Sequence, residues 1–266
     1  MVFFFNDCAF GIASPPTELL AYAHRLGIAA PDEVQAPIHI LEQSGYVRIA
    51  VGEAVAILDC APIGPDHLPA HAHADTLSFE LSLAGQRVVV NSGTSEYGTG
   101  AERQRQRGTA AHSTVVVDGE DSSEVWAGFR VARRARPGPI VLESGPSTAS
   151  VKCSHDGYRR LRGGCTHARS WEFGSSSVMI VDNVSGTCAR ADARLFLHPD
   201  VQPAMAGPSE VLLRLGREGT ISVQISGAEA VEIQRSFWHP RFGERIATHC
   251  ICARFDGSSL RTLMVW

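Results

Sequence analysis

Residues 67–119 of the chain read HLPAHAHADTLSFELSLAGQRVVVNSGTSEYGTGAERQRQRGTAAHSTVVVDG, and this stretch carries the strongest structural signals in the sequence. Apolar and polar residues alternate over 77–83 and again over 86–91, with Ala84-Gly85 between the two runs. A period of two is typical of a half-buried strand, and a short connection containing Gly between two such runs predicts a β-hairpin. A third strand is predicted at 113–117, which is rich in β-branched residues and ends at the turn signal Asp118-Gly119.

The same pattern continues on both sides of this stretch. Residues 46–51 and 54–60 flank Gly52-Glu53 and form a second predicted hairpin. Turn signals separate the other predicted strands, which are 178–182, 193–197, 211–215, 220–225, 248–255 and 260–266. Many short antiparallel strands at fairly regular spacing favour a mostly β fold, either a sandwich or a barrel.

One helix is predicted near the N-terminus, over residues 15–26. Ser14 can cap it, a proline follows in the first turn, and Gly27 can end it. The leucines between Leu19 and Leu26 fall on one face, so the helix is expected to be amphipathic.

The composition describes an ordinary globular chain of 266 residues and 28.6 kDa, with a formal charge of −4 and 44% hydrophobic residues. These values exclude a disordered tail, a fibre and a disulfide-stapled mini-protein. No apolar run approaches the length of about 20 residues that a membrane helix needs. The apolar N-terminal run lacks a basic start and is interrupted by Asn6 and Asp7, so it does not predict a secretory signal. Seven cysteines without a CxxC pair predict free, buried thiols.

The charge is unevenly distributed along the chain. Residues 103–169 contain eleven Arg and one Lys against six acidic residues, a net charge of +6, whereas the rest of the chain carries −10. A basic middle in an acidic protein points to an anionic partner. Nucleic acid is not expected, because the chain is acidic overall and lacks aromatic-interleaved basic motifs. An acidic small molecule or an acidic glycan fits the pattern.

Three histidines are candidates for chemistry. His71 and His73 are two residues apart, so an extended chain would direct both imidazoles to one face, with Asp75 next on that face. His112 precedes a predicted strand. Imidazoles with an oxygen donor suit zinc. Ordinary core or surface histidines are the alternative, and a cupin-type metal enzyme is another, although its ligand spacing is imperfect here.

The whole block resembles the C-terminal β-sandwich of the heparinase II/III family of polysaccharide lyases. HAHADTLSFELSLAGQRVVVNSGTSEYG is similar to the family's H-x-H-A-D-x-x-S-F strand followed by its Asp-x-Gly-Thr turn, and RGTAAHSTVVVDG is similar to its R-x-T-x-x-H-N-T-V-x-V-D-G strand. A looser resemblance runs through GYRRL, LFLHPDV and FWHPRFGERI, so it covers residues 35–266. The resemblance implies an antiparallel, multi-stranded, supersandwich-like β-sandwich, with residues 1–34 as a short helical remnant.

The resemblance also implies an activity and its residues. The family cleaves uronic-acid-containing glycans, such as glycosaminoglycans or alginate-like polymers, by β-elimination. His71 matches the catalytic histidine, and His73 and His112 match two zinc ligands. Asn91 stands where the family has its third ligand, an Asp, and its amide oxygen is a weaker donor. Arg103 and Arg107 match positions that can bind a sugar carboxylate. Loss of bound zinc on replacing either matching histidine would support this site.

In this family the sandwich is the second half of the protein, and an α/α toroid precedes it and supplies other catalytic residues. Residues 1–34 resemble only the tail end of that toroid, so we expect the isolated chain to be weak or inactive and the missing toroid to be its partner. The family implies a periplasmic or extracellular place for the full-length protein. The alternative function is a non-catalytic module of the same fold that binds glycans or assists exopolysaccharide assembly.

Overall fold

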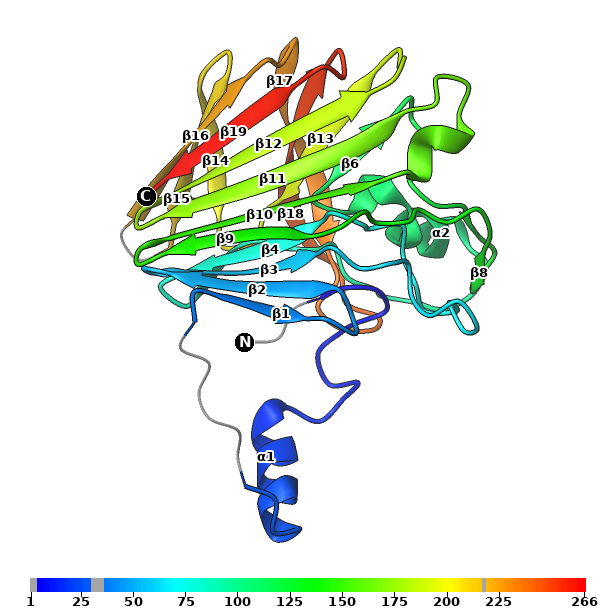
Figure 1. Cartoon of the computed structure of the whole chain (residues 1–266), viewed down its shortest axis with the longest axis vertical. Helices are drawn as coiled ribbons and strands as arrows, with labels where there is room; N and C mark the ends of the chain where they lie inside the picture. The colour runs from blue at the N-terminus through cyan, green and yellow to red at the C-terminus, as the bar shows by residue number, and fades with distance from the viewer. Residues whose placement is uncertain (1–3, 30–35, 217–218) are drawn as a thin grey trace.

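The computed structural model describes residues 4–29, 36–216 and 219–266, and its strands gather into stacked antiparallel sheets (Figure 1). The first sheet has five strands in the order β1-β2-β3-β4-β5. These strands are β1 (Ile38–Leu41), β2 (Tyr46–Val51), β3 (Ala54–Asp59), β4 (Phe79–Leu83) and β5 (Gln86–Val89).

A second sheet of eight strands faces the first, in the order β14-β15-β16-β19-β12-β11-β10-β9. Its strands are β9 (Val141–Gly145), β10 (Thr148–His155), β11 (Thr166–Gly174), β12 (Ser177–Ser185), β14 (Gln202–Gly207), β15 (Glu210–Leu215), β16 (Gly219–Ser226) and β19 (Leu260–Val265). A four-stranded sheet in the order β17-β18-β13-β6 extends the layers. It consists of β6 (Val115–Val117), β13 (Ala191–Phe196), β17 (Ala230–Trp238) and β18 (Ile246–Phe255).

Shorter elements complete the chain. They are the hairpin β7 (Val125–Trp126) and β8 (Arg130–Val131), the helices α1 (Pro16–Arg25) and α2 (Ala101–Arg107), and the 3₁₀ turns η1 (Thr109–Ala111) and η2 (Gly157–Arg160). No helix in the described part of the chain is long and apolar enough to cross a membrane.

The core lies between the sheets because the strands bury alternate residues. β2 and β11 both alternate buried with partly exposed positions. Phe79 of the five-stranded sheet meets Trp171 of the eight-stranded sheet edge to face, with ring centroids 6.3 Å apart. Burying one such side chain stabilises the fold by about 1.5–3 kcal/mol. The predicted antiparallel β-sandwich is therefore confirmed, including both predicted hairpins, β2–β3 and β4–β5.

Several elements were not predicted. Two of them, β10 and β11, do alternate buried with more exposed residues, whereas β14, β17 and α2 lack a clear pattern. β14 and β17 run along sheet edges and bury few of their residues, so their sequences show little alternation. α2 is the polar segment AERQRQR and has no apolar stripe. Its buried side chains are Arg103, Gln106 and Arg107, which charge patterning assigns to the surface.

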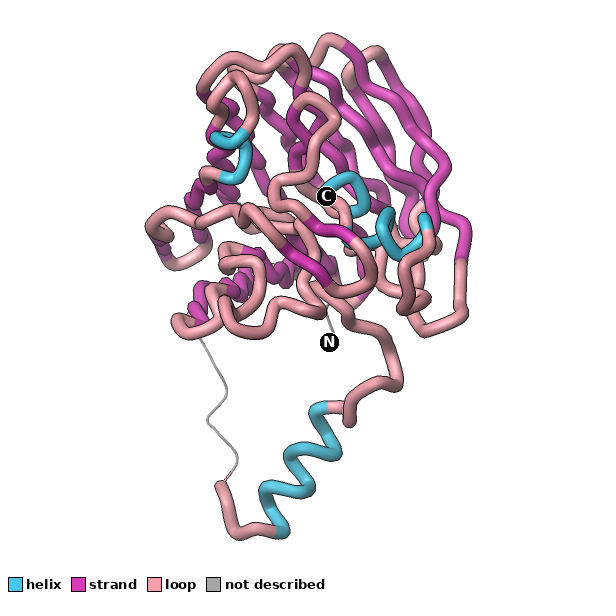
Figure 2. Tube along the Cα trace, turned by 90° about the vertical axis from the view of Figure 1, so that its right-hand side faces the viewer, coloured by secondary structure: helices cyan, strands magenta, loops and turns pink. Residues whose placement is uncertain are grey.

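Helix α1 projects away from the sandwich (Figures 1 and 2). The structure describes every residue of α1, and none of them is buried. Leu19 in the helix and Leu26, which caps its C-terminal end, are each 57% exposed. The prediction that Ser14 caps the helix is wrong, because Pro15 is the N-cap and no side chain caps the first turn. Gly27 ends the helix with φ +72, as predicted. The predicted domain boundary between residues 34 and 35 lies outside the described residues.

The cysteines are free, as predicted. Five of the seven are buried and two are half-buried, and all seven lie in the described part of the chain. Cys250 and Cys252 lie side by side on β18 with their sulfur atoms 4.0 Å apart.

Candidate functional site

The segment 4–10 packs into the body of the sandwich, close to the predicted histidines. The Phe4 N–H donates to the Glu80 carboxylate on β4 at 3.0 Å. The Asp7 N–H donates to the carbonyl of His71 at 3.1 Å. This short segment, which precedes the projecting helix, therefore contributes a carboxylate to the site.

The Asp7 carboxylate is the centre of the site, and four side chains converge on it, those of His71, His73, Thr94 and Arg103. His71 Nδ1 lies 3.0 Å from Asp7 Oδ2, and His73 Nε2 lies 2.8 Å from Asp7 Oδ1. Arg103 pairs with both oxygens, with Nη2 2.7 Å from Oδ2. Burial opposes ionisation of Asp7, but the hydrogen bonds from His73 and Arg103 outweigh it and hold the pKa of this carboxyl well below its usual range. Asp7 is therefore an ionised acceptor.

His71 is the exposed member of this group. Its side chain is 62% exposed, whereas that of Asp7 is 1% exposed. Because an ionised carboxylate only accepts hydrogen bonds, His71 Nδ1 must donate, and a neutral imidazole then keeps its lone pair on Nε2. The rings of Tyr97 and Phe129 flank His71 with centroids 5.8 Å away. The arrangement holds one imidazole with a free basic nitrogen at the surface.

His73, Asn91 and His112 lie together and are buried, as the predicted metal set requires. The rings of His73 and His112 are 5.2 Å apart between centroids. His112 Nδ1 lies 3.1 Å from Asn91 Oδ1, and the Asn91 N–H donates to the Glu80 carboxylate at 3.1 Å. Burial lowers the pKa of both imidazoles, although the Asp7 carboxylate partly offsets this at His73. Both rings are therefore neutral, the form that binds metals.

The segment that carries His71 and His73 is not a strand, in contrast to the prediction of an extended chain. β4 begins only at Phe79. The two imidazoles still reach one group, Asp7, but one is exposed and the other buried. Asp75, the next residue of the predicted face, accepts a hydrogen bond from the backbone of Asn6 at 3.3 Å and is buried. Burial raises the pKa of Asp75 to about 7.

Arg103 and Arg107 are both completely buried in α2. Arg103 Nε donates to the carbonyl of Gly128 at 3.0 Å. Arg107 donates to the carbonyl of Ala72 at 3.1 Å and to that of Ala127 at 3.2 Å. The two guanidinium groups thus tie the β7–β8 turn to the segment that carries His71. Their expected contact with a sugar carboxylate stays a prediction, because here they bind acceptors of the protein itself.

A second polar cluster lies inside the sandwich. His155 and His167 are opposite each other on β10 and β11, with ring nitrogens 3.3 Å apart. His167 Nε2 lies 2.7 Å from Asp182, which also accepts a hydrogen bond from Arg169 Nε at 2.7 Å. All four side chains are buried. They are cross-strand partners within the core.

Sequence reasoning missed Asp7 and the aromatic rim around His71. Asn6 and Asp7 interrupt an otherwise apolar run, and that interruption is the signal that could have identified Asp7. Tyr97 contacts Phe129 and Phe242 edge to face, with centroids 5.3 and 4.8 Å apart. These rings come from three separate loops, so no local pattern joins them.

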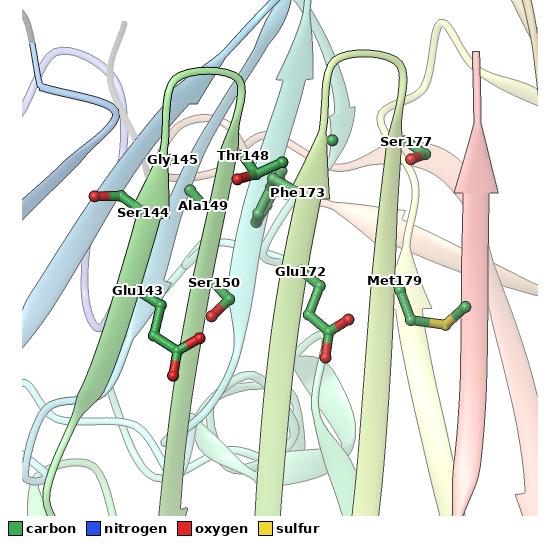
Figure 3. A pocket seen from close by; sticks show the side chains of 11 residues that line it. Glu143, Ser144, Gly145, Thr148, Ala149, Ser150, Glu172, Phe173, Ser177 and Met179 are labelled. Atoms are coloured by element: carbon green, nitrogen blue, oxygen red, sulfur yellow. The ribbon is translucent and has the colours of Figure 1, made fainter.

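A shallow hollow of about 720 Å³ lies elsewhere, on the outer face of the eight-stranded sheet. Glu143 of β9, Ser150 of β10 and Glu172 of β11 form one row across it, as Figure 3 shows. Two carboxylates would repel an acidic glycan, and none of the predicted site residues lines this hollow. We therefore assign the candidate site to the surface around His71.

The donor atoms partly fit a metal ion. His73 Nδ1 and His112 Nε2 are buried and have no hydrogen-bond partner among the described residues. A free imidazole lone pair is the group that zinc binds. Within 4–29, 36–216 and 219–266 there is no cluster of three or more His, Cys, Asp or Glu side chains that could hold a metal. The fit thus extends to two nitrogen ligands.

Comparison with known proteins gives consistent matches. The family described as "Heparinase II/III-like, C-terminal" matches residues 34–266. The heparan sulfate lyase HepC from Pedobacter heparinus has a similar structure, with a TM-score of 0.79 at 15% identity, over 99% of this chain and 43% of that one. The heparinase III BT4657 gene product gives a TM-score of 0.77 at 17% identity, over 99% of this chain and 43% of the other.

One curated relative also matches in sequence. FtsZ-localized protein C of Caulobacter vibrioides is 30% identical over 214 residues, which are 71% of this chain and 35% of that protein. The chain therefore spans about a third of this relative and less than half of the two lyase structures.

Proposed function

The chain belongs to the heparinase II/III-like, C-terminal family, and we propose that it is the β-sandwich part of a polysaccharide lyase that cleaves uronic-acid-containing glycans by β-elimination. The observation that carries this proposal is His71. It is an exposed imidazole whose Nδ1 is held by the buried Asp7 carboxylate at 3.0 Å, so that Nε2 is free to exchange a proton with a substrate.

In the proposed reaction, a base takes the proton on C5 of a uronic acid. The free Nε2 of His71 takes part in this proton transfer. The electrons of the C5–H bond form a double bond between C4 and C5, and the bond from C4 to the glycosidic oxygen breaks. An acid protonates the leaving oxygen, and no water is added. Asp7 fixes the tautomer and direction of His71, as carboxylates do for catalytic imidazoles.

The metal assignment is part of the same proposal. His73 and His112 would hold a zinc ion, which supplies positive charge that stabilises anionic intermediates nearby. Arg103 and Arg107 support the site in a different way. By fixing the loops on both sides of His71, they hold the imidazole and its aromatic neighbours in one arrangement.

We also propose that the chain is incomplete for catalysis. The lyases it resembles are more than twice its length, and a proton donor and much of the substrate cleft would come from a preceding helical domain. The exposed apolar face of α1 supports this proposal, because such a face usually packs against another element.

A second candidate is a non-catalytic module that binds glycans or assists exopolysaccharide assembly. It is favoured by the burial of Arg103 and Arg107, which leaves neither guanidinium open to a sugar carboxylate. The curated relative is named for its localization with FtsZ rather than for a lyase activity, which is compatible with this candidate.

The experiment compares the isolated chain with the protein translated from the complete reading frame that contains it. Both are incubated with heparan sulfate and with an alginate, and the unsaturated product is followed by ultraviolet absorbance. We expect product only from the complete protein, its loss in His71→Ala, and its retention in the matched control His67→Ala, which removes another exposed histidine. Glycan binding without product in the complete protein would support the second candidate instead.

A further inference from the structure

Two thiols, those of Cys250 and Cys252, lie next to each other on the outer face of the four-stranded sheet. The two residues are two positions apart on β18, so their side chains point to the same face of the sheet. Their sulfur atoms are 4.0 Å apart. Ile251 between them belongs to the main core, which places the two thiols on the opposite face. Neither thiol has a role in the proposed lyase reaction.

The two thiols differ in their access to solvent. Both belong to a small apolar cluster with Phe196 and Trp238. Cys250 is 1% exposed, and burial raises the pKa of its thiol well above the usual range. Cys252 is 6% exposed and also lines a hollow of about 20 Å³, which is room for a molecule about the size of water. Cys252 is therefore the thiol that a small reagent meets first.

Positive charge surrounds Cys252. Three arginines and two acidic residues line the same hollow, which are Arg190, Arg194, Arg254, Asp192 and Glu232. Arg194 of β13 is directly opposite Cys252 in the strand register, so their Cβ atoms lie on one face about 5 Å apart. Arg190 and Arg254 both pair with Asp192, whereas the Arg194 Nε is buried and has no hydrogen-bond partner among the described residues. A negative charge on the Cys252 sulfur would offset the charge of Arg194.

The hydrogen bonds of Cys252 favour the loss of its proton. Its S–H donates to Oε1 of Gln234 at 3.2 Å, and Gln234 is an exposed residue of the edge strand β17. The Cys250 thiol is placed to donate to the Cys252 sulfur. This hydrogen bond and the charge of Arg194 lower the pKa of Cys252, although burial opposes them. A thiol beside an arginine, with a second thiol within reach, is the usual setting of an oxidation-sensitive cysteine.

We propose that Cys252 is a site of reversible oxidation by hydrogen peroxide and that Cys250 is its resolving thiol. The Cys252 thiolate attacks one peroxide oxygen, so that an S–O bond forms, the O–O bond breaks and the departing hydroxide takes up a proton to become water. Cys252 is thereby oxidised to a sulfenic acid and the peroxide is reduced. Cys250 then gives up its proton, and its sulfur attacks the Cys252 sulfur. The S–O bond breaks, a second water leaves, and a disulfide remains.

The geometry of the strand predicts that this disulfide is easily reduced. Residues two apart in a strand have Cα atoms about 6.6–6.8 Å apart, which is the upper end of the range of about 4.4–6.8 Å for disulfides. The sulfur atoms must also approach from 4.0 Å to about 2.0 Å. β18 is paired with β17 on one side and with β13 on the other, so it resists the necessary bend. A strained disulfide is readily reduced by thiols, which makes the modification reversible.

The test treats the reduced, folded chain with hydrogen peroxide, alkylates the remaining thiols and analyses a tryptic digest by mass spectrometry. Trypsin releases residues 246–254 as one peptide, which contains both thiols and no other cysteine. We expect this peptide to lose two hydrogens and to escape alkylation before Cys8 or Cys188 reacts, although those two are the half-buried cysteines and the others are buried. Dithiothreitol should restore alkylation of the peptide.

Variants separate the roles of the two thiols and of the arginine. Cys250→Ser should stop at the sulfenic acid of Cys252, which dimedone traps, and Cys252→Ser should leave Cys250 unoxidised. Arg194→Gln should slow the oxidation by about 10-fold, the change in thiolate fraction that one pKa unit brings. The matched control Cys188→Ser should react like the unaltered chain. Circular dichroism confirms that each variant is folded.

Three results would overturn the proposal. They are an unchanged peptide 246–254, oxidation of Cys8 or Cys188 before this peptide, and an Arg194→Gln variant that reacts as fast as the unaltered chain. The proposal does not depend on lyase activity, so its failure would leave the proposed function untouched.

Discussion

Replacing Asp7 by Ala removes the shared acceptor of four side chains at once. The Arg103 guanidinium, which is completely buried, would then lack its counter-ion, and His73 would lose the acceptor of its buried Nε2–H. Removing one partner of a buried ion pair typically costs about 3–5 kcal/mol. With a urea m-value of about 3 kcal/mol/M for a chain of this size, the unfolding midpoint should fall by about 1–1.7 M.

The assay is urea unfolding followed by tryptophan fluorescence, run as a double-mutant cycle with Arg103→Met. Because Asp7→Ala and Arg103→Met break the same pair, the double variant should be less destabilised than the sum of the single variants, by about 2 kcal/mol. The control Glu124→Ala breaks an exposed pair with Arg133 and should shift the midpoint far less. Additive effects of the two site variants, or a midpoint for Asp7→Ala equal to that of the control, would refute the reasoning.

Three further predictions concern the rest of the chain. Burial lowers the pKa of His155 well below that of an unfolded histidine, so its contribution to stability is present above about pH 6.5 and is lost as the pH falls. The unaltered chain should therefore exceed His155→Gln in free energy of unfolding by less at pH 5 than at pH 7.5. This difference should shrink by at most about 1.4 kcal/mol per pH unit, and a difference that grows as the pH falls contradicts the prediction. A methyl group at Gly93 would meet the carbonyl oxygen of His239, whereas a methyl group at Gly85 would meet open space. Gly93→Ala should therefore lower the thermal midpoint much more than the control Gly85→Ala. Equal shifts would exclude a special role for the turn that contains Gly93. Leu20→Lys on the exposed face of α1 should leave the urea midpoint unchanged and reduce self-association measured by light scattering, whereas a lower midpoint would show that this face packs internally.

The part of the fold that can be predicted from the sequence is the part that has a clear local pattern. The strands with one buried face, such as β2 and β12, alternate clearly, and their hairpins follow from the turn residues between them. α2 shows the limit of such patterns. Its buried face consists of arginines whose charges are satisfied by carbonyl oxygens and by Asp7, and this compensation is visible only in three dimensions.

In the site, too, local motifs predict some features and only the three-dimensional structure shows the others. The β4–β5 hairpin and its flanking loops bring three residues of the predicted motifs to one place, namely His73, Asn91 and His112. Asp7 could not be predicted from periodicity, because it contacts His71 across 64 positions of the chain. The same holds for Arg103 and Arg107. Their motif predicts that they matter to the site, whereas their burial depends on loops that no local pattern describes.

The most direct test of the proposed function asks whether the complete protein cleaves an acidic glycan by elimination or by adding water. The measurement is mass spectrometry of the products formed in ¹⁸O-labelled water, with His71→Ala as the inactive comparison. β-Elimination adds no water, so we predict an unsaturated uronic acid at the new end, no ¹⁸O in either product, and loss of both products in His71→Ala. Incorporation of ¹⁸O into a saturated product, or full activity of His71→Ala, would contradict the proposed reaction.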